Sequence, residues 1–292
     1  MRIGIDIGGT KTLGVVLDDA GDITTEAIVA TPDASRLVDA IAEVVSRLTP
    51  ALGPIGIGAA GLITADGVMR AAANVSGVSD LPLAALVRER LGVECRVDND
   101  NTCAGLAEWR EGAGRGQRDM IYVGLGTGIG GALVCGGALQ RGANGFAGEI
   151  GHVVIDPEGP LCPCGRRGCW ERFASGTALA SQARALGLDG DDGAVILAAA
   201  AEDGSSPSHR RLIEDFSRWL ALGLVNLTNI FDPEQIVLGG GVMDSAAVLL
   251  GPTRRWFAEL LYAPGLRSHP HLSPARFGSR SAAIGAALLF DL

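Results

Sequence analysis

A short pattern occurs twice in this chain of 292 residues, and it limits the possible folds more than any other feature. At residues 3–10 and again at 121–128, an apolar run leads into a turn of Gly and Thr. A second apolar run follows each turn, at 14–16 and 132–134. Each copy predicts a strand, a tight turn and a returning strand. A duplicated unit predicts two similar lobes that face each other with both turns at a common cleft, although unrelated hairpins can also resemble each other by chance.

The boundary between the lobes is expected at 112–117, where glycine and charged residues replace the periodic pattern. We therefore expect a smaller N-terminal lobe over residues 1–115 and a larger C-terminal lobe over residues 116–279. The apolar end of the chain, about 280–292, predicts a helix that packs back on the first lobe. A chain of this length is long for one core and comfortable for two.

Hydrophobic periodicity places the remaining elements coarsely. Strands are expected at 23–31, 55–60, 95–97 and 235–238, and helices at 33–49, 83–91, 101–111, 176–226 (interrupted near 204–207) and 243–261. This mixture predicts an α/β protein in which each lobe is a mixed sheet flanked by helices.

Charge and composition exclude several classes of protein. The net charge of −9 argues against nucleic-acid binding, which needs clustered Lys and Arg. No uncharged apolar run reaches the roughly 18 residues of a membrane helix, and Asp6 interrupts the run that a signal peptide would need. We therefore expect a cytoplasmic protein with no nucleic-acid or membrane partner. Lys11 is the only lysine, which reflects either a compositional bias or a site that prefers an ammonium group.

Three cysteines lie within eight residues, in the run C-P-C-G-R-R-G-C that contains Cys162, Cys164 and Cys169. His152 precedes them by ten residues. Three thiolates and an imidazole form a closed tetrahedral zinc site with no position left for a water molecule. The sequence therefore predicts a structural Zn²⁺ site, with a redox pair or accidental clustering as the alternative.

Two acidic residues flank this cluster. Glu149 stands three residues before His152 and Glu171 two residues after Cys169, so a metal loop would hold both carboxylates near one place. Carboxylates suit the recognition of vicinal hydroxyls because each one accepts several hydrogen bonds. Solvated surface acids are the alternative.

Three Gly-rich turns are candidates for phosphate binding. Two are Gly8-Gly9-Thr10-Lys11 and Gly126-Thr127-Gly128, and the third, with Gly240 and Gly241, follows the strand at 235–238. Their backbone N–H groups could cradle phosphates, although the first two do not fit the P-loop pattern and many such turns bind nothing. With Asp6 on the strand before the first turn, the set predicts a phosphate clamp with an acid for the Mg²⁺ shell.

The triplet Asp98-Asn99-Asp100 follows the strand at 95–97, where a cleft is expected. Phosphoryl transfer to a hydroxyl needs a carboxylate that accepts the proton as the new bond forms. Asp100 is the candidate for this base. The alternative is a helix N-cap, since Asp100 or Asn101 could cap the helix that follows.

Together these motifs resemble the ROK family of bacterial sugar kinases and repressors, and within it the zinc-containing glucokinases. The resemblance runs from Ile3 to about Ala287, and it rests on both Gly/Thr turns, on 148–152, on the Cys cluster through Glu171, on 174–177 and on 231–233. It implies an actin-like, hexokinase-type fold of two lobes. It also implies ATP-dependent phosphorylation of a hexose at the 6-hydroxyl: glucose first, with N-acetylmannosamine, N-acetylglucosamine or fructose as alternatives.

The resemblance also implies roles for single residues. Asp100 would deprotonate the 6-hydroxyl, and the hexose would contact Gly61, Asn74, Asn99, Asp100, Glu149, His152 and Glu171. ATP with its Mg²⁺ would lie along Asp6, Gly8, Gly9, Thr10, Lys11, Gly126, Thr127, Gly128, Gly240 and Gly241. Zn²⁺ would be held by His152, Cys162, Cys164 and Cys169. The family tends to form homodimers and homotetramers, and the same is expected here.

The chain departs from the family pattern in two places. Residues 99–102 read Asn-Asp-Asn-Thr where family kinases commonly read Asn-Asp-Ala-Asn, and 75–78 lacks an aromatic residue that often follows Asn74. The expected base is intact, and the second departure bears on which sugar fits. A sugar-responsive regulator without kinase activity is the alternative from another class. Such repressors carry a winged-helix module ahead of the first strand, which here starts at residue 2, so a kinase is expected.

Overall fold

The computed structural model describes residues 1–49, 51–72, 74–188, 193–201 and 206–292, and these form two compact units. The first unit contains Met1–Gly116, Leu139–Gly148 and Ser279–Leu292. The second contains Gln117–Ala138 and Glu149–Gly278. The segment Leu139–Gly148, which the sequence analysis placed with the C-terminal lobe, belongs to the first unit because its contacts lie there.

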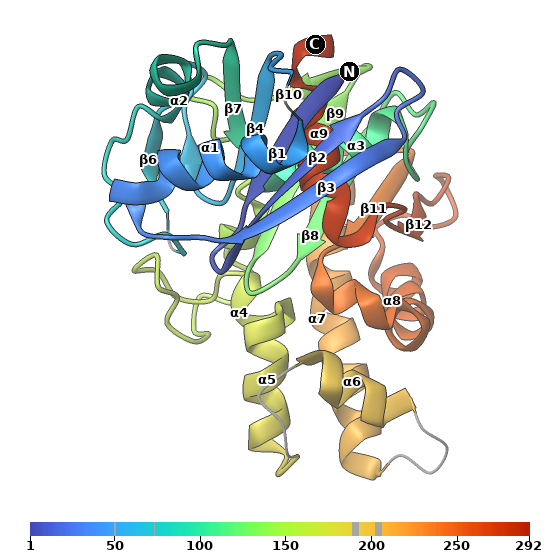
Figure 1. The fold of residues 1–292 in the computed structure, drawn as a ribbon. Coiled ribbons are helices and arrows are strands. Elements are labelled where there is room, and N and C mark those ends of the chain that lie inside the picture. The colour runs from blue at the N-terminus through green and yellow to red at the C-terminus, as the bar shows by residue number, and fades with distance from the viewer. Residues whose placement is uncertain (50, 73, 189–192, 202–205) are drawn as a thin grey trace. The chain divides into compact units, whose positions relative to one another are not determined.

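The first unit is built on a five-stranded mixed sheet in the order β3-β2-β1-β4-β7 (Figure 1). β1, β2 and β3 form an antiparallel meander, whereas β1, β4 and β7 run parallel. The carboxyl ends of the three parallel strands therefore meet at one edge, where Ile7, Ala59 and Asn99 share a register position. The strands are β1 (Arg2–Ile7), β2 (Lys11–Leu17), β3 (Ile23–Ala30), β4 (Ile55–Ala59) and β7 (Cys95–Asn99), and a separate hairpin joins β5 (Leu62–Ile63) to β6 (Met69–Ala71).

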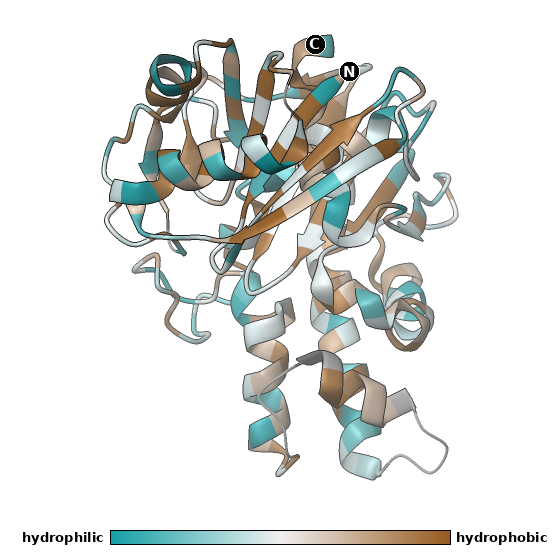
Figure 2. Cartoon of the chain, viewed as in Figure 1, coloured by the Kyte–Doolittle hydropathy of each residue, from teal (hydrophilic) through white to brown (hydrophobic). Residues whose placement is uncertain are grey.

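Helices cover both faces of this sheet. One face carries α1 (Leu37–Leu48) and α2 (Leu83–Leu91), and the other carries α3 (Asp100–Arg110) and α9 (Ser281–Ala287). A short turn, η1 (Ala34–Arg36), precedes α1, and another, η5 (Leu289–Asp291), follows α9. The buried residues of α1 recur at helical spacing and are all apolar, while the hydrophilic residues of the helix are exposed (Figure 2).

The close packing of α9 on the first sheet depends on glycine. A Cβ at Gly4 would lie 2.0 Å from the backbone oxygen of Ala283, and one at Gly56 would lie 1.8 Å from that of Ala286. Any side chain at these two positions would push the helix away from the sheet. The same helix packs against α3, so it supports the element that begins with Asp100.

The second sheet repeats the strand order of the first as β10-β9-β8-β11-β12, and of its edge strand β10 only Ala138 is grouped with the second unit. β8 and β9 are antiparallel, and β8, β11 and β12 are parallel. The hairpins β1–β2 and β8–β9 therefore hold equivalent places, and the predicted duplication is confirmed. The strands are β8 (Met120–Leu125), β9 (Ile129–Cys135), β10 (Ala138–Gln140), β11 (Gln235–Gly239) and β12 (His271–Pro274).

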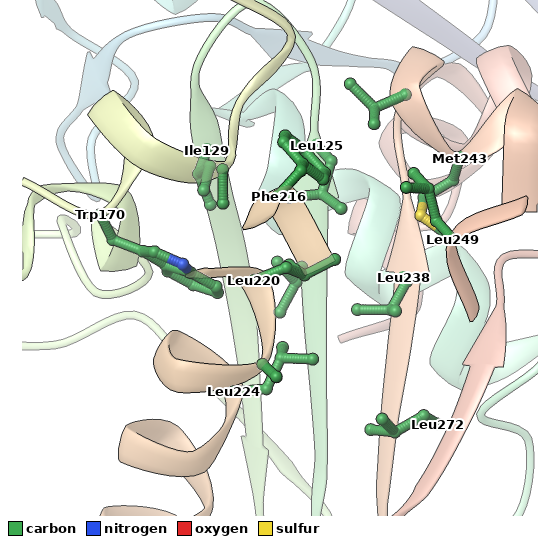
Figure 3. Close-up of a cluster of buried hydrophobic side chains, with 14 of the residues drawn as sticks. Leu125, Ile129, Trp170, Phe216, Leu220, Leu224, Leu238, Met243, Leu249 and Leu272 are labelled. Carbon is green, nitrogen blue, oxygen red and sulfur yellow. The ribbon is translucent and has the colours of Figure 1, made fainter. Parts of the chain in front are cut away.

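The core of the second unit forms where α7 packs against its sheet. Phe216, Leu220 and Leu224 of α7 lie in one buried cluster with Trp170 and Leu238 (Figure 3). The helices are α4 (Glu171–Ala174), α5 (Gly176–Ala185), α6 (Gly193–Ala201), α7 (Pro207–Phe231) and α8 (Ala246–Leu260), with short turns η2 (Ile150–His152) and η3 (Gly241–Ser245). A further short turn, η4 (Gly278–Arg280), begins at the last residue of the second unit and leads into the first.

The helices of the second unit follow the predicted helical regions with two refinements. The helix expected at 243–261 starts with the tight turn η3 and becomes α-helical at Ala246. The interruption expected near 204–207 lies partly outside the described residues, and α7 begins at Pro207, where proline is well tolerated. No helix in the described part of the chain is both long enough and apolar enough to span a membrane.

Candidate active site and metal centre

Asp100 is the first residue of α3, directly after β7 ends at Asn99. The helix is capped by Asn99, whose side-chain oxygen accepts hydrogen bonds from the backbone N–H groups of Asn101 and Thr102 at 2.8 and 3.1 Å. The alternative in which Asp100 or Asn101 caps the helix is therefore wrong. Asp100 instead keeps its carboxylate beside the helix start, where Oδ1 accepts from the backbone N and from Nδ2 of Asn101 at 2.9 and 3.1 Å.

Asn99 also ties β7 to the loop that follows β4. Its Nδ2 donates to the backbone oxygen of Gly61 at 3.1 Å. Gly61 has a φ of +141°, and a Cβ there would lie 2.2 Å from the backbone oxygen of Ala71. Only glycine fits this position, so Gly61 and Asn99 are brought together as expected.

The first Gly/Thr turn lies at the same edge of the first sheet. The N–H of Gly8 donates to the backbone oxygen of Lys11 at 3.0 Å and closes the turn between β1 and β2. Gly9 lies against Asn74, since a Cβ on Gly9 would be 2.8 Å from the Cβ of that residue. Thr10 and Lys11 are exposed. The turn thus presents open backbone next to a predicted sugar-binding residue.

Two carboxyl groups at this edge interact. The pKa of Asp6 is raised to about 7, chiefly by desolvation and in addition by the negative charge of Asp100, while the positive charge of Lys11 opposes the shift. Desolvation also raises the pKa of Asp100. The edge therefore has more negative charge than its own residues neutralise, which suits a ligand that brings a cation or a proton.

Arg141 is a residue of this region that no sequence motif indicated. Its Nε donates to Oδ2 of Asp98 at 2.7 Å, and the Asp98 side chain is only 8% exposed. The two residues lie 43 positions apart in the chain, so no local spacing could have predicted the pair.

In the second unit, Gly126-Thr127-Gly128 forms the turn between β8 and β9, and the N–H of Gly126 donates to the oxygen of Gly128 at 3.0 Å. The start of α5 is bound to this turn. The N–H of Gly176 donates to the oxygen of Gly126 at 2.8 Å, and Oγ1 of Thr177 donates to that of Thr127 at 2.8 Å. The turn is therefore held in place by a helix N-terminus, which favours anions.

Gly240 and Gly241 lie at the same edge of the second sheet as that turn. Gly239 of β11 shares a register position with Gly124 of the parallel strand β8. Gly240 has a φ of +83°, and a Cβ there would lie 2.4 Å from the oxygen of Leu125. No neighbour approaches a Cβ placed on Gly241 within 4 Å, so the backbone at the start of η3 stays accessible.

The four expected metal ligands come together in the second unit. One nitrogen of His152 and the Sγ atoms of Cys162, Cys164 and Cys169 all lie within 4.8 Å of one another. Nδ1 of His152 is 3.8 Å from Sγ of Cys162, and the Sγ atoms of Cys164 and Cys169 are 3.5 Å apart. Ligands about 2.3 Å from a tetrahedral Zn²⁺ lie about 3.8 Å apart. The donor set and its spacing therefore fit zinc, and the sulfur atoms are too far apart for a disulfide of about 2.05 Å.

Local backbone structure explains how this loop folds. The N–H of Cys162 donates to the oxygen of Arg166 at 2.8 Å, and the N–H of Gly165 donates to that of Cys162 at 2.9 Å. A backbone hydrogen bond from Arg166 lowers the pKa of Cys164 to about 6, whereas burial raises the pKa of Cys169. Beside the loop, Nε1 of the buried Trp170 donates to the oxygen of Trp219 at 3.0 Å, which anchors the loop on α7.

The two predicted sugar-binding acids lie beside His152. Oε2 of Glu149 is 4.0 Å from Nε2 of the imidazole, and Oε1 of Glu171 is 3.8 Å from Nδ1. Glu171 also reaches the Gly/Thr turn, since a Cβ on Gly128 would lie 2.6 Å from its Oε2. Its side chain is 17% exposed, so it is not a freely solvated surface acid.

The predicted site residues therefore form two groups, one in each unit. Each group combines a Gly/Thr turn at the end of a central strand with carboxylates held at the same sheet edge. Two mixed sheets of equal strand order that carry such turns define a two-lobed α/β protein of the actin-like, hexokinase type. The ROK family model matches residues 2–291. The chain belongs to the ROK family, so the expected fold class and family are confirmed.

Individual relatives agree with this assignment. The glucokinase of Streptomyces coelicolor is 35% identical, and the alignment covers 98% of this chain and 96% of the relative. The N-acetylmannosamine kinase of Citrobacter koseri is 33% identical, with 98% and 97% covered. The crystal structure of a ROK family glucokinase from Streptomyces griseus in complex with glucose and AMPPNP superimposes with a TM-score of 0.89 at 37% identity, covering 99% of this chain and 98% of that one.

Proposed function

We propose that this chain is an ATP-dependent kinase of the hexokinase type, which transfers the γ-phosphoryl group of ATP to the 6-hydroxyl of a hexose. The observation that supports this most is the edge of the first sheet, where Asp100 stands free of the capping role and interacts with Asp6 beside the first Gly/Thr turn. A base next to a phosphate-binding turn is what phosphoryl transfer to a hydroxyl requires.

Asp100 accepts the proton of the 6-hydroxyl as the oxygen attacks phosphorus. The hydrogen bonds from Asn101 fix the orientation of the carboxylate. Desolvation raises the pKa of Asp100, which makes its ionised form a stronger base than an exposed carboxylate. The remaining catalysis is positioning and neutralisation of charge on the phosphates.

The other residues bind the two substrates. The hexose hydroxyls form hydrogen bonds with Gly61, Asn74, Asn99, Glu149, His152 and Glu171, and they donate to the carboxylates of the two glutamates. ATP, with the Mg²⁺ that accompanies it, lies along both Gly/Thr turns and the turn at Gly240 and Gly241. Asp6 and Lys11 serve the phosphate end of the nucleotide. Backbone N–H groups carry no charge of their own, so they can bind phosphates in a chain whose net charge is −9.

His152, Cys162, Cys164 and Cys169 hold a structural Zn²⁺. The ion has no open coordination position in such a set, and its contribution is to fix the loop. The loop in turn places Glu171, which follows the ligand Cys169 by two residues and begins α4. The metal centre therefore orients a sugar-binding carboxylate and takes no part in the chemistry.

Glucose is the hexose that we propose first. The similar glucokinases, one of them in complex with glucose, support this choice. The similar N-acetylmannosamine kinase keeps an N-acetyl hexosamine as the second candidate, and the stretch after Asn74 bears on the choice because it follows a residue that lies against Gly9 of the first turn. We further propose that the protein is cytoplasmic and forms a homodimer or homotetramer.

A coupled assay of ADP release across hexoses tests the proposal. The panel contains glucose, mannose, fructose, N-acetylglucosamine and N-acetylmannosamine, each at the same concentration with saturating Mg-ATP. We expect turnover with one or more of these sugars and the highest kcat/KM with glucose. A higher value for N-acetylmannosamine would move the assignment to that sugar, and ADP release that needs no sugar, or none at all, would contradict the kinase.

A further inference from the structure

A short chain of hydrogen bonds leads from Arg141 to the base. Nε of Arg141 donates to Oδ2 of Asp98 at 2.7 Å, and Oδ1 of Asp98 accepts from the backbone N–H of Asn99 at 2.9 Å. Asn99 then caps α3 and so fixes the start of the helix at Asp100. Every member of this chain belongs to the first unit.

The burial of Asp98 makes Arg141 important to this arrangement. Asp98 occupies the last register position before the strand end, level with Gly58 of β4 and Asp6 of β1. A carboxylate that is 8% exposed is costly to hold without a positive partner. If Arg141 were lost, the buried carboxylate of Asp98 would have no positive partner and would turn toward water, and its bond to the backbone of Asn99 would weaken.

The loop that carries Arg141 is packed on the first unit, and this packing holds Arg141 in position beside Asp98. The N–H of Ala147 donates to the oxygen of Arg141 at 3.0 Å and closes a loop. Gly145 in that loop approaches the backbone of Ile63 so closely that a Cβ would lie 2.6 Å from its oxygen. The guanidinium therefore reaches Asp98 from an anchored loop, which limits the entropy lost when the pair forms.

We propose that Arg141 is a positioning residue for the base: through Asp98 it holds the junction of β7 and α3 and thereby the orientation of Asp100. This inference rests on the proposed role of Asp100. It adds a role for a residue that touches neither the proposed substrates nor the metal ligands.

A pocket beside the pair makes the proposal testable by chemical rescue. Arg141, Asp98, Arg88 and Arg96 line a pocket of about 680 Å³ that lies within the first unit. The side chain of Arg141 is 34% exposed. In an Arg141→Ala variant, a free guanidinium ion can therefore enter from solvent and take the place of the missing side chain beside Asp98.

The expected result is a selective loss of kcat. Displacement of a catalytic group by about 1 Å costs on the order of 100-fold in rate, so we expect kcat of Arg141→Ala to fall about 10- to 100-fold. The KM for ATP and the zinc content should stay unchanged. Guanidinium chloride, at concentrations well below those that unfold the protein, should restore much of kcat, whereas NaCl at equal ionic strength should not.

Arg88→Ala is the matched control. Arg88 lines the same pocket, but it bonds within its own helix, where Nε donates to the oxygen of Ala84 at 3.1 Å. We expect kcat of Arg88→Ala to match that of the wild type with or without guanidinium. Equal losses in both variants would overturn the proposal, as would an Arg141→Ala variant with normal kcat or one that guanidinium does not rescue.

A double variant covers the case in which Arg141→Ala does not fold. Asp98→Asn together with Arg141→Ala leaves no unpaired buried charge and should fold. We expect the kcat of the double variant to be lower than that of the wild type but no lower than that of a soluble Arg141→Ala variant. The reason is that both substitutions remove the same interaction, the ion pair between Arg141 and Asp98, so their effects do not add. A double variant with wild-type kcat would contradict the proposal. An inactive wild type would instead contradict the proposed function, so the two failures can be told apart.

Discussion

At the scale of single residues, neighbouring positions at the end of β7 have different tasks. Asn99 caps α3 and binds the backbone of Gly61, whereas Asp100, which is not the cap, is the proposed base. The division is physical: an amide both accepts from the helix N–H groups and donates to a carbonyl, which a carboxylate cannot do. Asp6 lies at the same edge of the sheet, and its carboxyl group interacts with that of Asp100. Two predictions belong to this scale.

The first concerns the pH dependence of stability in the protein without ATP. The pKa of Asp6 is raised from 3.8 to about 7 in the folded state, so the native protein binds this proton more tightly than the unfolded chain does. The stability that Asp6 contributes is then fully present below about pH 4 and is lost as the pH rises to about 7. Thermal melts of wild type and Asp6→Asn should diverge over that range, with the variant the more stable at pH 8.

Asp39→Asn provides the control for that comparison, since Asp39 is an exposed acid on α1. Its melting temperature should track that of the wild type at every pH. A difference between wild type and Asp6→Asn that does not change with pH would contradict the shifted pKa.

The second prediction concerns Glu171, which lies between the metal ligands and the second Gly/Thr turn. A hydrogen bond to a charged group contributes about 1.5–3 kcal/mol, so Glu171→Gln should raise the KM for glucose by about tenfold or more. The KM for ATP should change little. Because Glu171 contacts Cys162, zinc content is measured alongside the kinetics and should stay the same. A variant in which only the KM for ATP rises would assign Glu171 to the phosphate turn.

At the scale of elements, the metal loop is positioned by the core on which it rests. Cys169 precedes Trp170, which is buried against α7, and Glu171 begins α4. A Cβ at Gly223 of α7 would lie 2.0 Å from the ring of Trp170, so the helix approaches the loop as closely as glycine permits. The core thus holds the loop next to Glu171, one of the two proposed sugar-binding acids.

Cys164→Ser tests this element. Cys164 is exposed, so the substitution removes a metal ligand without opening the core. A metal present at about 1,000 times its dissociation constant stabilises the folded state by about 4 kcal/mol, and we expect a loss of that order together with the zinc. Metal analysis and thermal melting measure both. Cys135→Ser, at a partly buried cysteine outside the cluster, is the control and should keep its zinc; unchanged zinc in Cys164→Ser would contradict the site.

The elements also show how far sequence reasoning reaches. Apolar periodicity predicted α2 at its observed bounds and both hairpins, because local spacing determines which face is buried. The metal ligands were predictable because thiols and imidazole fall close together in the chain. The identity of the helix cap was not, since Asn99, Asp100 and Asn101 are all capable of it. Arg141 and the placement of its segment depend on a contact with Asp98 from a distant part of the chain, which leaves no local pattern.

At the scale of the whole molecule, the two units share one strand order, and each carries its own group of predicted site residues. Neither group has all the parts of a kinase: the proposed base lies in the first unit, and the metal centre with its two acids lies in the second. The family assignment covers both units.

The most direct test of the central claim compares Asp100→Asn with the wild type. Glucose binding is measured by calorimetry, and transfer to the 6-hydroxyl is followed through glucose-6-phosphate dehydrogenase. A general base contributes about 100- to 10,000-fold in rate, so kcat should fall by that factor while the dissociation constant for glucose stays nearly unchanged. An Asp100→Asn variant that forms glucose 6-phosphate at the wild-type rate would contradict the account.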